Sequence, residues 1–354
     1  MVDFSYPYSV DWRVYKVEEE TWDEIVEIPN VVSVTVDRDC TDQAPLLETS
    51  SMVIDIPPNN DFESGWYKTI AHVTQGPSCE RIPIATHLYS VENETYDYGI
   101  RQISAKGRSA LAPAADIRMQ DGSFVPKNSN GAEWVARQLR SILKAPVRIE
   151  SEGNENGFSL KRHIVYDSND SVLSACWSVL DAGKWCLRVD GDGIVRIMKR
   201  PTTPSFVFTD TTIRFLYPGI KKSSSKDEVP NRYVARDGGK TVIVVNDDPE
   251  SETSTVATGR RIDAPIDTNP YLMQGESIEA YAKRKLEEVS TISVQYDYTR
   301  EYIPELYPLD MYEATIPLFG MDGEFRVAKQ KLTLDMGIEV SETATQEIKY
   351  WRRT

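Results

Sequence analysis

The sequence predicts a mainly β protein with an α+β insertion, in which two antiparallel β-barrel or β-sandwich domains flank a small α+β unit. Over the first 115 residues, short segments rich in Val and Ile alternate with polar residues, a pattern typical of strands with one buried face. A loop rich in Gly, Pro, Asn and Ser at 119–131 then precedes amphipathic helical segments. After residue 200 the strand pattern returns, which predicts a duplicated β-domain.

The first predicted domain, residues 1–115, contains seven candidate strands separated by Pro, Asn, Asp and Glu. They span residues 12–17, 24–28, 31–37, 51–56, 66–74, 81–91 and 95–104. Short strands at this regular spacing predict a small antiparallel barrel or sandwich.

The middle unit, residues 116–200, begins with a helix expected over 132–143. Asn130 is its expected N-cap, and Pro146 stops it soon after its end. A second helix is expected within 167–183, where Gly183 has the position of a C′ glycine.

Two short segments around 190–193 complete the middle unit as a predicted hairpin, with its turn at the sequence DGDG. The third unit, residues 201–354, reads as strands with one helix over 275–290. Glu279 and Lys283 are expected to pair on the surface of that helix, because they are four residues apart. The polar segments 221–231 and 248–259 are expected to be mobile loops.

The charge of the chain is uneven. It carries 55 acidic and 40 basic residues, for a net charge of −15, and residues 1–100 alone hold 19 acids against 5 bases. Affinity for nucleic acid needs clustered Lys and Arg, so this composition argues against a simple nucleic-acid binder. No stretch approaches the ~18 consecutive apolar residues of a membrane helix, and no secretory signal is visible.

Two acidic clusters are candidate cation sites. Asp190 and Asp192 resemble a fragment of a calcium loop, but flanking strands favour a tight hairpin turn. The segment DRDCTD, residues 37–42, places three carboxylates around Cys40, and a solvated strand end is the favoured interpretation. The acidic run 18–20 is likewise interpreted as a solvated turn.

No other residue pattern predicts catalysis. His72, His87 and His163 lack the spacing of zinc or triad chemistry and are interpreted as ordinary strand residues. Cys40, Cys79, Cys176 and Cys186 form no C-x-x-C pair and are expected to be buried free thiols. With no nucleophile-elbow, P-loop or H-E-x-x-H motif, we predict no catalytic, cofactor-binding or metal-binding residues, no cofactor and no enzyme activity.

Aromatic residues are frequent in the predicted strands, with 7 Trp and 18 Tyr in the chain. Tyr and Trp are enriched at protein–protein interfaces, so these residues favour assembly. A carbohydrate-binding face and simple core packing remain open alternatives. The strand-borne aromatics are Trp12, Tyr15, Trp66, Tyr67, Tyr96, Tyr98, Tyr296, Tyr298 and Tyr302.

The order of several loose motifs resembles the baseplate hub and tail-tip proteins of tailed bacteriophages and prophages. The resemblance covers essentially the whole chain. It rests on DWRVYKV, TWDEI, IPNVVSVTVDRDCTD, RIPIATHLYS, GRSALAPAADI, VLSACWSVLDAGKWCLRVDGDGIVRI, VPNRYVARDGG, YAKRKLEEVS and LDMYEATIPLFGMDGEFRVAKQKLTLDMG, in that order.

This resemblance implies two tail-tube-like β-domains in one chain and a structural hub of the virion tail. In such a hub a homotrimer forms a pseudo-sixfold ring that joins the tail tube to the central spike or tip and lets DNA pass. The implied partners are the tube protein, distal tail or wedge proteins and the spike, with no membrane insertion, and the chain would be made in the host bacterial cytoplasm. Because the sequence ends at Thr354 after the last predicted strand, the resemblance implies a hub without a built-in hydrolase.

Two other functions stay open at this point, namely a carbohydrate-binding module and a cell-wall hydrolase of the tail tip. The hub interpretation adds one expectation about charge. Part of the acidic excess of residues 1–100 should line the lumen of the ring, where it would repel passing DNA.

Overall fold

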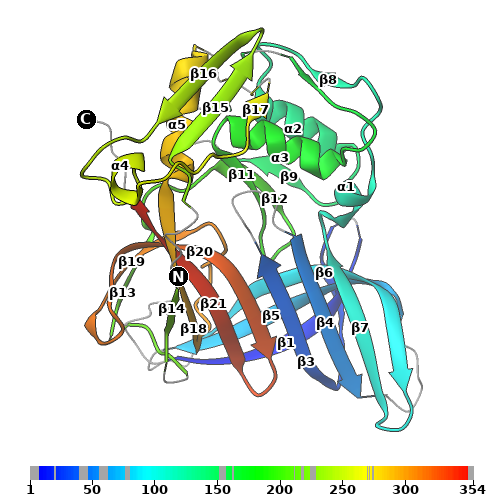
Figure 1. Ribbon diagram of the computed structural model, residues 1–354. Helices are drawn as coiled ribbons and strands as arrows, with labels where there is room; N and C mark the ends of the chain where they lie inside the picture. Colours follow the sequence, from blue (N-terminus) through cyan, green and yellow to red (C-terminus); the bar gives the residue numbers. More distant parts are fainter. Residues whose placement is uncertain are drawn as a thin grey trace.

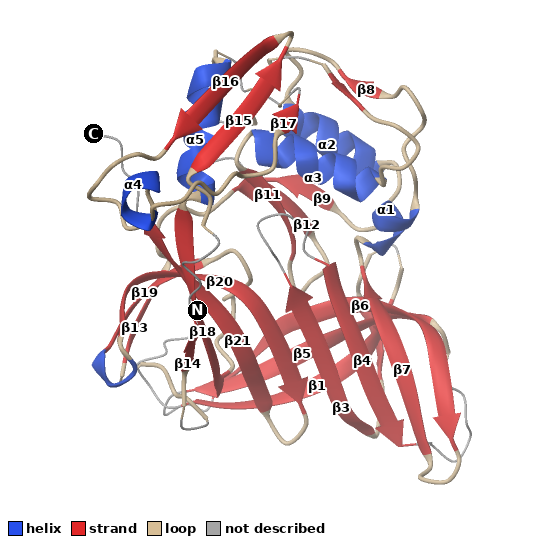
Figure 2. Ribbon diagram, viewed as in Figure 1, coloured by secondary structure: helices blue, strands red, loops and turns tan. Residues whose placement is uncertain are grey.

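The computed structural model confirms a mainly β fold, with 50% of residues in strands and 15% in helices (Figures 1 and 2). A 13-stranded sheet dominates the molecule, and the helices gather with three small sheets at one end of it. The described residues are 8–19, 21–39, 47–55, 63–75, 80–150, 157–161, 163–210, 212–216, 219–223, 229–268, 270, 272 and 275–349. Within these ranges no helix is long and apolar enough to cross a membrane.

The N-terminal half of the large sheet is an antiparallel array in the order β3-β4-β7-β6-β5-β1-β2. Its strands are β1 (Tyr8–Val17), β2 (Glu24–Glu27), β3 (Val31–Asp39), β4 (Leu47–Asp55), β5 (Gly65–Gln75), β6 (Glu80–Asp97) and β7 (Gln102–Ser109). The expected strand at 95–104 is wrong, because β6 and β7 form a hairpin there. The Asp97 carboxylate accepts hydrogen bonds from the backbone N–H of Gly99 and Ile100, which folds this stretch into a turn.

The middle unit combines helices with short strands (Figure 1). Its elements are α1 (Ala112–Asp116), β8 (Phe124–Val125), α2 (Gly131–Arg140), β9 (Val147–Ile149), β10 (Ile164–Val165), α3 (Val172–Ala182), β11 (Trp185–Val189) and β12 (Val195–Lys199). The predicted N-cap is confirmed, since the Asn130 side chain accepts a hydrogen bond from the Glu133 N–H. The predicted hairpin is confirmed as the antiparallel pair β11–β12.

The end of α3 differs from the prediction by one residue. Gly183 is the C-cap at a φ of −93°, and Lys184 takes the left-handed conformation that was expected of the glycine. Position 183 needs glycine for a steric reason, because a Cβ atom there would lie 2.4 Å from the Phe158 ring. The glycine therefore allows an aromatic ring to pack directly on the end of the helix.

The C-terminal half contributes the rest of the large sheet and a second small unit. Its elements are β13 (Phe206–Thr209), β14 (Lys221–Ser223), β15 (Arg232–Asp237), β16 (Lys240–Val245), α4 (Thr255–Thr258), β17 (Asp267–Thr268), α5 (Ile278–Val289), β18 (Thr291–Glu301), β19 (Met311–Ile316), a 3₁₀ turn (Pro317–Phe319), β20 (Met321–Leu334) and β21 (Ile338–Lys349). Helix α5 packs on the sheet β16-β15-β17 with a core of its own.

Three details of this half correct the sequence analysis. Residues 221–223, expected to belong to a mobile loop, form β14 and pair with β18, while residues 224–228 of that segment lie outside the described residues. The Glu279 carboxylate is bound by Lys240 of β16 and not, as expected, by Lys283. The segment 248–259 is not a loose loop, because the buried amides of Asn231 and Asn246 hold it by hydrogen bonds to Thr253 and Ser251.

Strand β20 joins the two halves into one sheet. Residues 321–326 pair with β19, and residues 329–334 pair with β3 of the N-terminal half. A bulge between Val327 and Lys329 separates the two stretches. The extra residue reverses which side chains point inward, so that Phe325 and Val327 enter the C-terminal core, while Leu332 and Leu334 enter the N-terminal core.

The two β halves are therefore continuous across the β3–β20 pair. The expected division of the chain at residues 115/116 and 200/201 stays a prediction.

Candidate functional site: a buried polar belt where the two β halves meet

A row of polar side chains crosses the large sheet at the β3–β20 seam. Glu48 on β4 pairs in register with Arg38 on β3, and Arg38 pairs with Gln330 on β20. Gln330 is opposite Glu342 on β21, which is opposite Tyr298 on β18. These five residues are all buried, and we call them, together with His87 and Arg300, the polar belt.

The N-terminal end of the belt is a buried charge triad. Arg38 Nε lies 3.1 Å from Glu48 Oε1, and His87 Nδ1 lies 3.1 Å from Glu48 Oε2. The Arg38 guanidinium also donates to the Thr86 carbonyl oxygen on β6. The triad thus ties three strands of the N-terminal half together.

The C-terminal end of the belt is centred on Glu342. Its carboxylate accepts hydrogen bonds from Arg300 and Tyr298, and from Gln330 Nε2 at 2.8 Å. The Tyr298 hydroxyl also lies 2.6 Å from the Tyr312 hydroxyl. Since a buried charge is tolerated only when it is paired and hydrogen-bonded, these contacts define one arrangement of the strands.

Burial and pairing act on the pKa values of the belt in opposite directions. Burial alone would raise the pKa of the Glu48 carboxyl, but attraction to His87 and Arg38 outweighs it and lowers the pKa below its usual value. At the other end, burial and the neighbouring Glu342 carboxylate raise the pKa of Tyr298 well above its usual value. Both groups are thereby held in the charge state that suits their partners.

The loop of residues 302–310, which we call the junction loop, packs over the belt and contacts all three parts of the chain. The guanidinium carbons of Arg38 and Arg188 lie 4.7 and 5.0 Å from the centre of the Tyr307 ring. The Tyr307 hydroxyl accepts a hydrogen bond from the Gly191 N–H in the β11–β12 turn. Arg188 also forms an ion pair with Asp310 at 2.8 Å.

The backbone of the junction loop supports this role. Leu309 donates to the Val327 carbonyl and Val327 donates to the Asp310 carbonyl, so the loop fills the bulge of β20. Glu305 and Leu309 have left-handed φ angles of 66° and 78°, which cost energy for residues other than glycine. The surrounding contacts must therefore hold the loop in place.

Gly191 sets how closely the middle unit approaches the large sheet. A Cβ atom at Gly191 would lie 1.8 Å from the Ala85 carbonyl oxygen on β6. We expect Gly191→Ala to destabilise the protein by about 1–3 kcal/mol, because backbone atoms must move to relieve this overlap. The midpoint of urea unfolding, followed by tryptophan fluorescence, measures the effect.

Gly337→Ala is the matched control for this substitution. Its Cβ atom would meet no heavy atom within 4 Å, and we expect a change within about 0.5 kcal/mol. Equal midpoints for Gly191→Ala and the control would contradict the close packing of the turn.

The acidic clusters from the sequence analysis serve as turn and strand-end residues. The Asp190 carboxylate accepts from the Ile194 N–H at 2.8 Å and from Arg196 Nε at 2.8 Å, which stabilises the hairpin turn. Asp39 is exposed and binds Lys329 at 2.7 Å, while Cys40 and Asp42 lie outside the described residues. Across the described ranges, no group of three or more His, Cys, Asp or Glu side chains is placed to hold a metal ion.

Two of the three histidines have the structural role expected from the sequence, and the third does not. His72 on β5 lies beside Asp11 on β1, and the His163 ring, just before β10, accepts a hydrogen bond from the Lys127 N–H, so both are ordinary structural residues as expected. His87 is not an ordinary strand residue, because it is 1% exposed and belongs to the charge triad. The triad could have been suspected from Arg38, which continues the inward-facing alternation of Val34 and Val36.

The described cysteines agree with the sequence analysis. Cys176 and Cys186 are buried free thiols, and burial raises their pKa values to about 12 and about 11. Both thiols are therefore unreactive at neutral pH. Cys40 and Cys79 lie outside the described residues.

The aromatic residues contribute more to cores than to surfaces. Tyr67, Tyr296, Tyr298 and Tyr302 are buried, and Tyr98 at 72% is the exposed member of the strand-borne set. The remaining four are partly buried.

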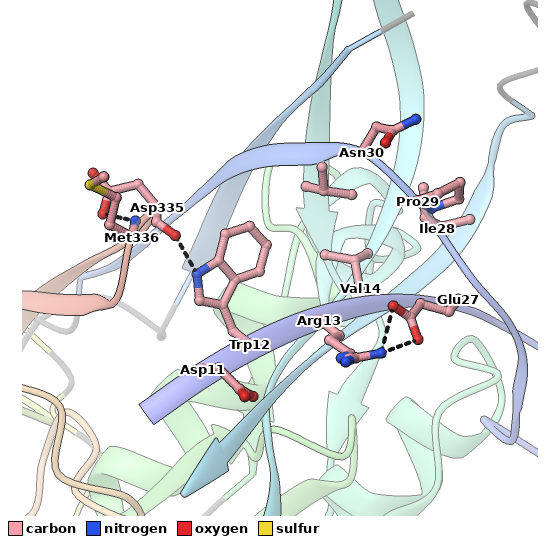
Figure 3. A pocket seen from close by; sticks show the side chains of 11 residues that line it. Asp11, Trp12, Arg13, Val14, Glu27, Ile28, Pro29, Asn30, Asp335 and Met336 are labelled. Atoms are coloured by element: carbon pink, nitrogen blue, oxygen red, sulfur yellow. Dashed lines mark hydrogen bonds and ion pairs between the residues drawn. The ribbon is translucent and has the colours of Figure 1, made fainter. Parts of the chain in front are cut away.

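A surface pocket of about 330 Å³ lies beside the seam, between β1, the start of β3 and the β20–β21 turn (Figure 3). Trp12 Nε1 donates to the Asp335 carbonyl at 2.9 Å, and Arg13 binds both oxygens of Glu27. The Trp12 hydrogen bond ties β1 to the C-terminal half, and the Arg13–Glu27 ion pair ties β1 to β2.

The polar belt and junction loop are suited to fixing how the two β halves and the middle unit are oriented relative to one another. The belt is buried, and its charged groups bind one another. The fold that results is a two-halved β protein with an α+β insertion, and it is similar to several solved structures.

Solved structures of tail proteins share this fold. The tail protein from Neisseria meningitidis MC58 has a TM-score of 0.62 at 13% identity, with 96% of this chain and 97% of that chain covered. The 43 kDa tail protein of prophage MuSo2 from Shewanella oneidensis has a TM-score of 0.61 at 13% identity, with 95% and 98% covered. Prophage tail protein gp18 from Listeria monocytogenes EGD-e has a TM-score of 0.54 at 10% identity, with 94% of each chain covered.

No family model matches the chain, and no curated protein matches its sequence. At identities of 10–13% the likeness establishes the fold. The resemblance found in the sequence is confirmed at that level, and the chain has the fold of phage and prophage tail proteins.

Proposed function

We propose that this chain is a structural hub or tip protein of a phage-like tail. The observation that carries the proposal is the fold match to three prophage or tail proteins along nearly the full length of both chains. A structural role also suits the polar belt, whose charged groups are buried and bound to each other. In this role the chain acts as a rigid building block, with no cofactor and no reaction of its own.

The assembly we propose is a homotrimeric ring with pseudo-sixfold symmetry. Three chains with two β halves each supply six similar β units, which suits a junction between a sixfold tail tube and a threefold spike. The ring would contact the tube protein, distal tail or wedge proteins and the spike, and DNA would pass through its lumen. It would be made in the bacterial cytoplasm and end in the virion tail.

Light scattering and negative-stain electron microscopy of the purified chain test this assembly. We expect three times the mass of one chain at high concentration, and rings with a central opening. A strictly monomeric protein, with no ring in tail particles that contain it, would overturn the proposal.

The acidic N-terminal region supports a repelling lumen. All five of its bases are bound to acids of the same region, through the pairs Arg13–Glu27, Lys16–Glu63, Arg38–Glu48, Lys68–Glu24 and Arg81–Asp11. The remaining acids therefore dominate the field of this region, and we propose that part of them line the lumen. A ring structure in which they face only outward would refute this placement.

A further inference from the structure

In the described part of the chain, the large sheet has an unpaired edge at each end of its main path, and a side branch ends at β13, which pairs only with β19. Strand β14 (Lys221–Ser223) pairs with β18, and β2 (Glu24–Glu27) pairs with β1. Among the described residues neither strand has a second neighbour. Unpaired backbone at a sheet edge is a template for pairing with another chain, so proteins usually cover or blunt it.

The β2 edge exposes apolar side chains. All four residues of β2 are exposed, with Ile25 at 62% and Val26 at 52%. Adjacent strand residues point to opposite faces, so exposure of both means that neither face of β2 is covered in the single chain. An edge with two exposed β-branched residues is suited to a protein contact.

The two edges also carry opposite charge. Next to β2, the exposed side chains of Glu18 and Asp23 have no ion pair within the described part of the chain. On β14, Lys221 and Lys222 are exposed and likewise without an ion pair there, although Lys222 lies over the Tyr296 ring at 5.2 Å. One edge therefore offers unpaired acids and the other unpaired lysines.

We propose that the β2 edge of one copy docks against the β14 edge of the next copy, and that three such contacts close the ring. The occupant is a second copy because complementary edges at the two ends of one sheet make a head-to-tail contact, which forms a closed ring when the rotation closes. The inference rests on the proposed homotrimer and assigns its interface. Ile25 and Val26 supply the apolar part of the contact, and the lysines of β14 face the acids beside β2.

The first test compares the oligomeric state of edge variants with that of the wild-type chain. We expect Ile25→Ser with Val26→Ser, and separately Lys221→Glu with Lys222→Glu, to raise the concentration of half-dissociation at least roughly tenfold, measured by mass photometry and light scattering. Since all four side chains are exposed, the circular dichroism spectrum and the urea midpoint of the monomer, measured at concentrations below trimer formation, should not change.

Matched controls lie away from the large sheet. Ile243→Ser on β16 removes an apolar side chain that is 51% exposed, and Lys127→Glu with Lys283→Glu reverses two exposed lysines. We expect trimers of unchanged stability for both controls.

A crosslinking test addresses the pairing itself. We expect a chain with Val26→Cys and Lys222→Cys to form disulfide-linked dimers and trimers on mild oxidation, whereas each single variant and the wild type should not. Because each single variant keeps the four native cysteines, links that appear only in the double variant report that the two edges meet between copies.

The outcomes separate the two proposals. A wild-type monomer would overturn the ring and this interface together. A wild-type trimer that all edge variants leave intact would overturn only the interface. Dissociation by the β2 changes without the crosslink to Lys222→Cys would assign β2 to another surface and refute its pairing with β14.

Discussion

Glu342→Ala is expected to lower the free energy of unfolding by about 3–5 kcal/mol. The Arg300 and Glu342 side chains are 1% and 0% exposed, so the substitution leaves a buried guanidinium without its carboxylate. It also removes the acceptor for Tyr298 and Gln330, whose donors then remain buried without this partner. Urea unfolding followed by circular dichroism measures the loss.

Two further variants make this result specific. Glu347→Ala removes an exposed carboxylate from the same strand and should change stability by less than about 0.5 kcal/mol. Arg300→Met combined with Glu342→Leu should recover much of the stability, because an apolar pair replaces the buried ion pair. A loss for Glu342→Ala no larger than for Glu347→Ala would show that the belt does not stabilise the seam.

Tyr307→Ala is expected to cost about 3–5 kcal/mol, as truncation of a buried aromatic ring commonly does. The ring contacts the guanidinium groups of Arg38 and Arg188, which belong to the N-terminal half and the middle unit. Its loss leaves a cavity where all three parts of the chain meet. We therefore expect the unfolding transition to occur at lower urea and to separate into more than one step, visible when fluorescence and circular dichroism are compared.

The control variants separate the contribution of the Tyr307 ring to stability from that of its hydroxyl group. Tyr307→Phe keeps the ring and removes only the acceptor for the Gly191 N–H, so we expect a loss near 1 kcal/mol. Tyr98→Ala removes a tyrosine that is 72% exposed and should be nearly neutral. If Tyr307→Ala unfolds like Tyr98→Ala, the junction loop does not hold the three parts together.

Local patterns in the sequence predicted the elements well where the cause is local. The N-cap of α2 depends on Asn130 and the residues just after it, and the β11–β12 turn depends on four consecutive residues. Errors arose where a neighbour distant in sequence took part. The glycine at the end of α3 is explained by Phe158, and the partner of Glu279 is Lys240 on another element.

The polar belt shows why the candidate site could not be predicted in full. The sequence analysis interpreted residues 37–42 as a solvated strand end, yet Arg38 follows Val34 and Val36 on the inward face of β3 and is buried. Which groups would satisfy that charge depends on the pairing of β3 with β4 and β20. No local pattern specifies a strand pairing between residues nearly 300 positions apart.

The amino-acid sequence by itself indicates the type of each unit, because the alternation of apolar and polar residues depends on neighbours within a turn or a strand. It also shows the resemblance to tail proteins, because that resemblance rests on the order of motifs along the chain. Only the tertiary structure shows three further features. The two β halves join into one sheet, the bulge in β20 directs its side chains into two cores, and the polar belt is buried beneath the junction loop. Their physical reason is that a buried charge or an inward-facing side chain acquires its partner only when distant strands pair.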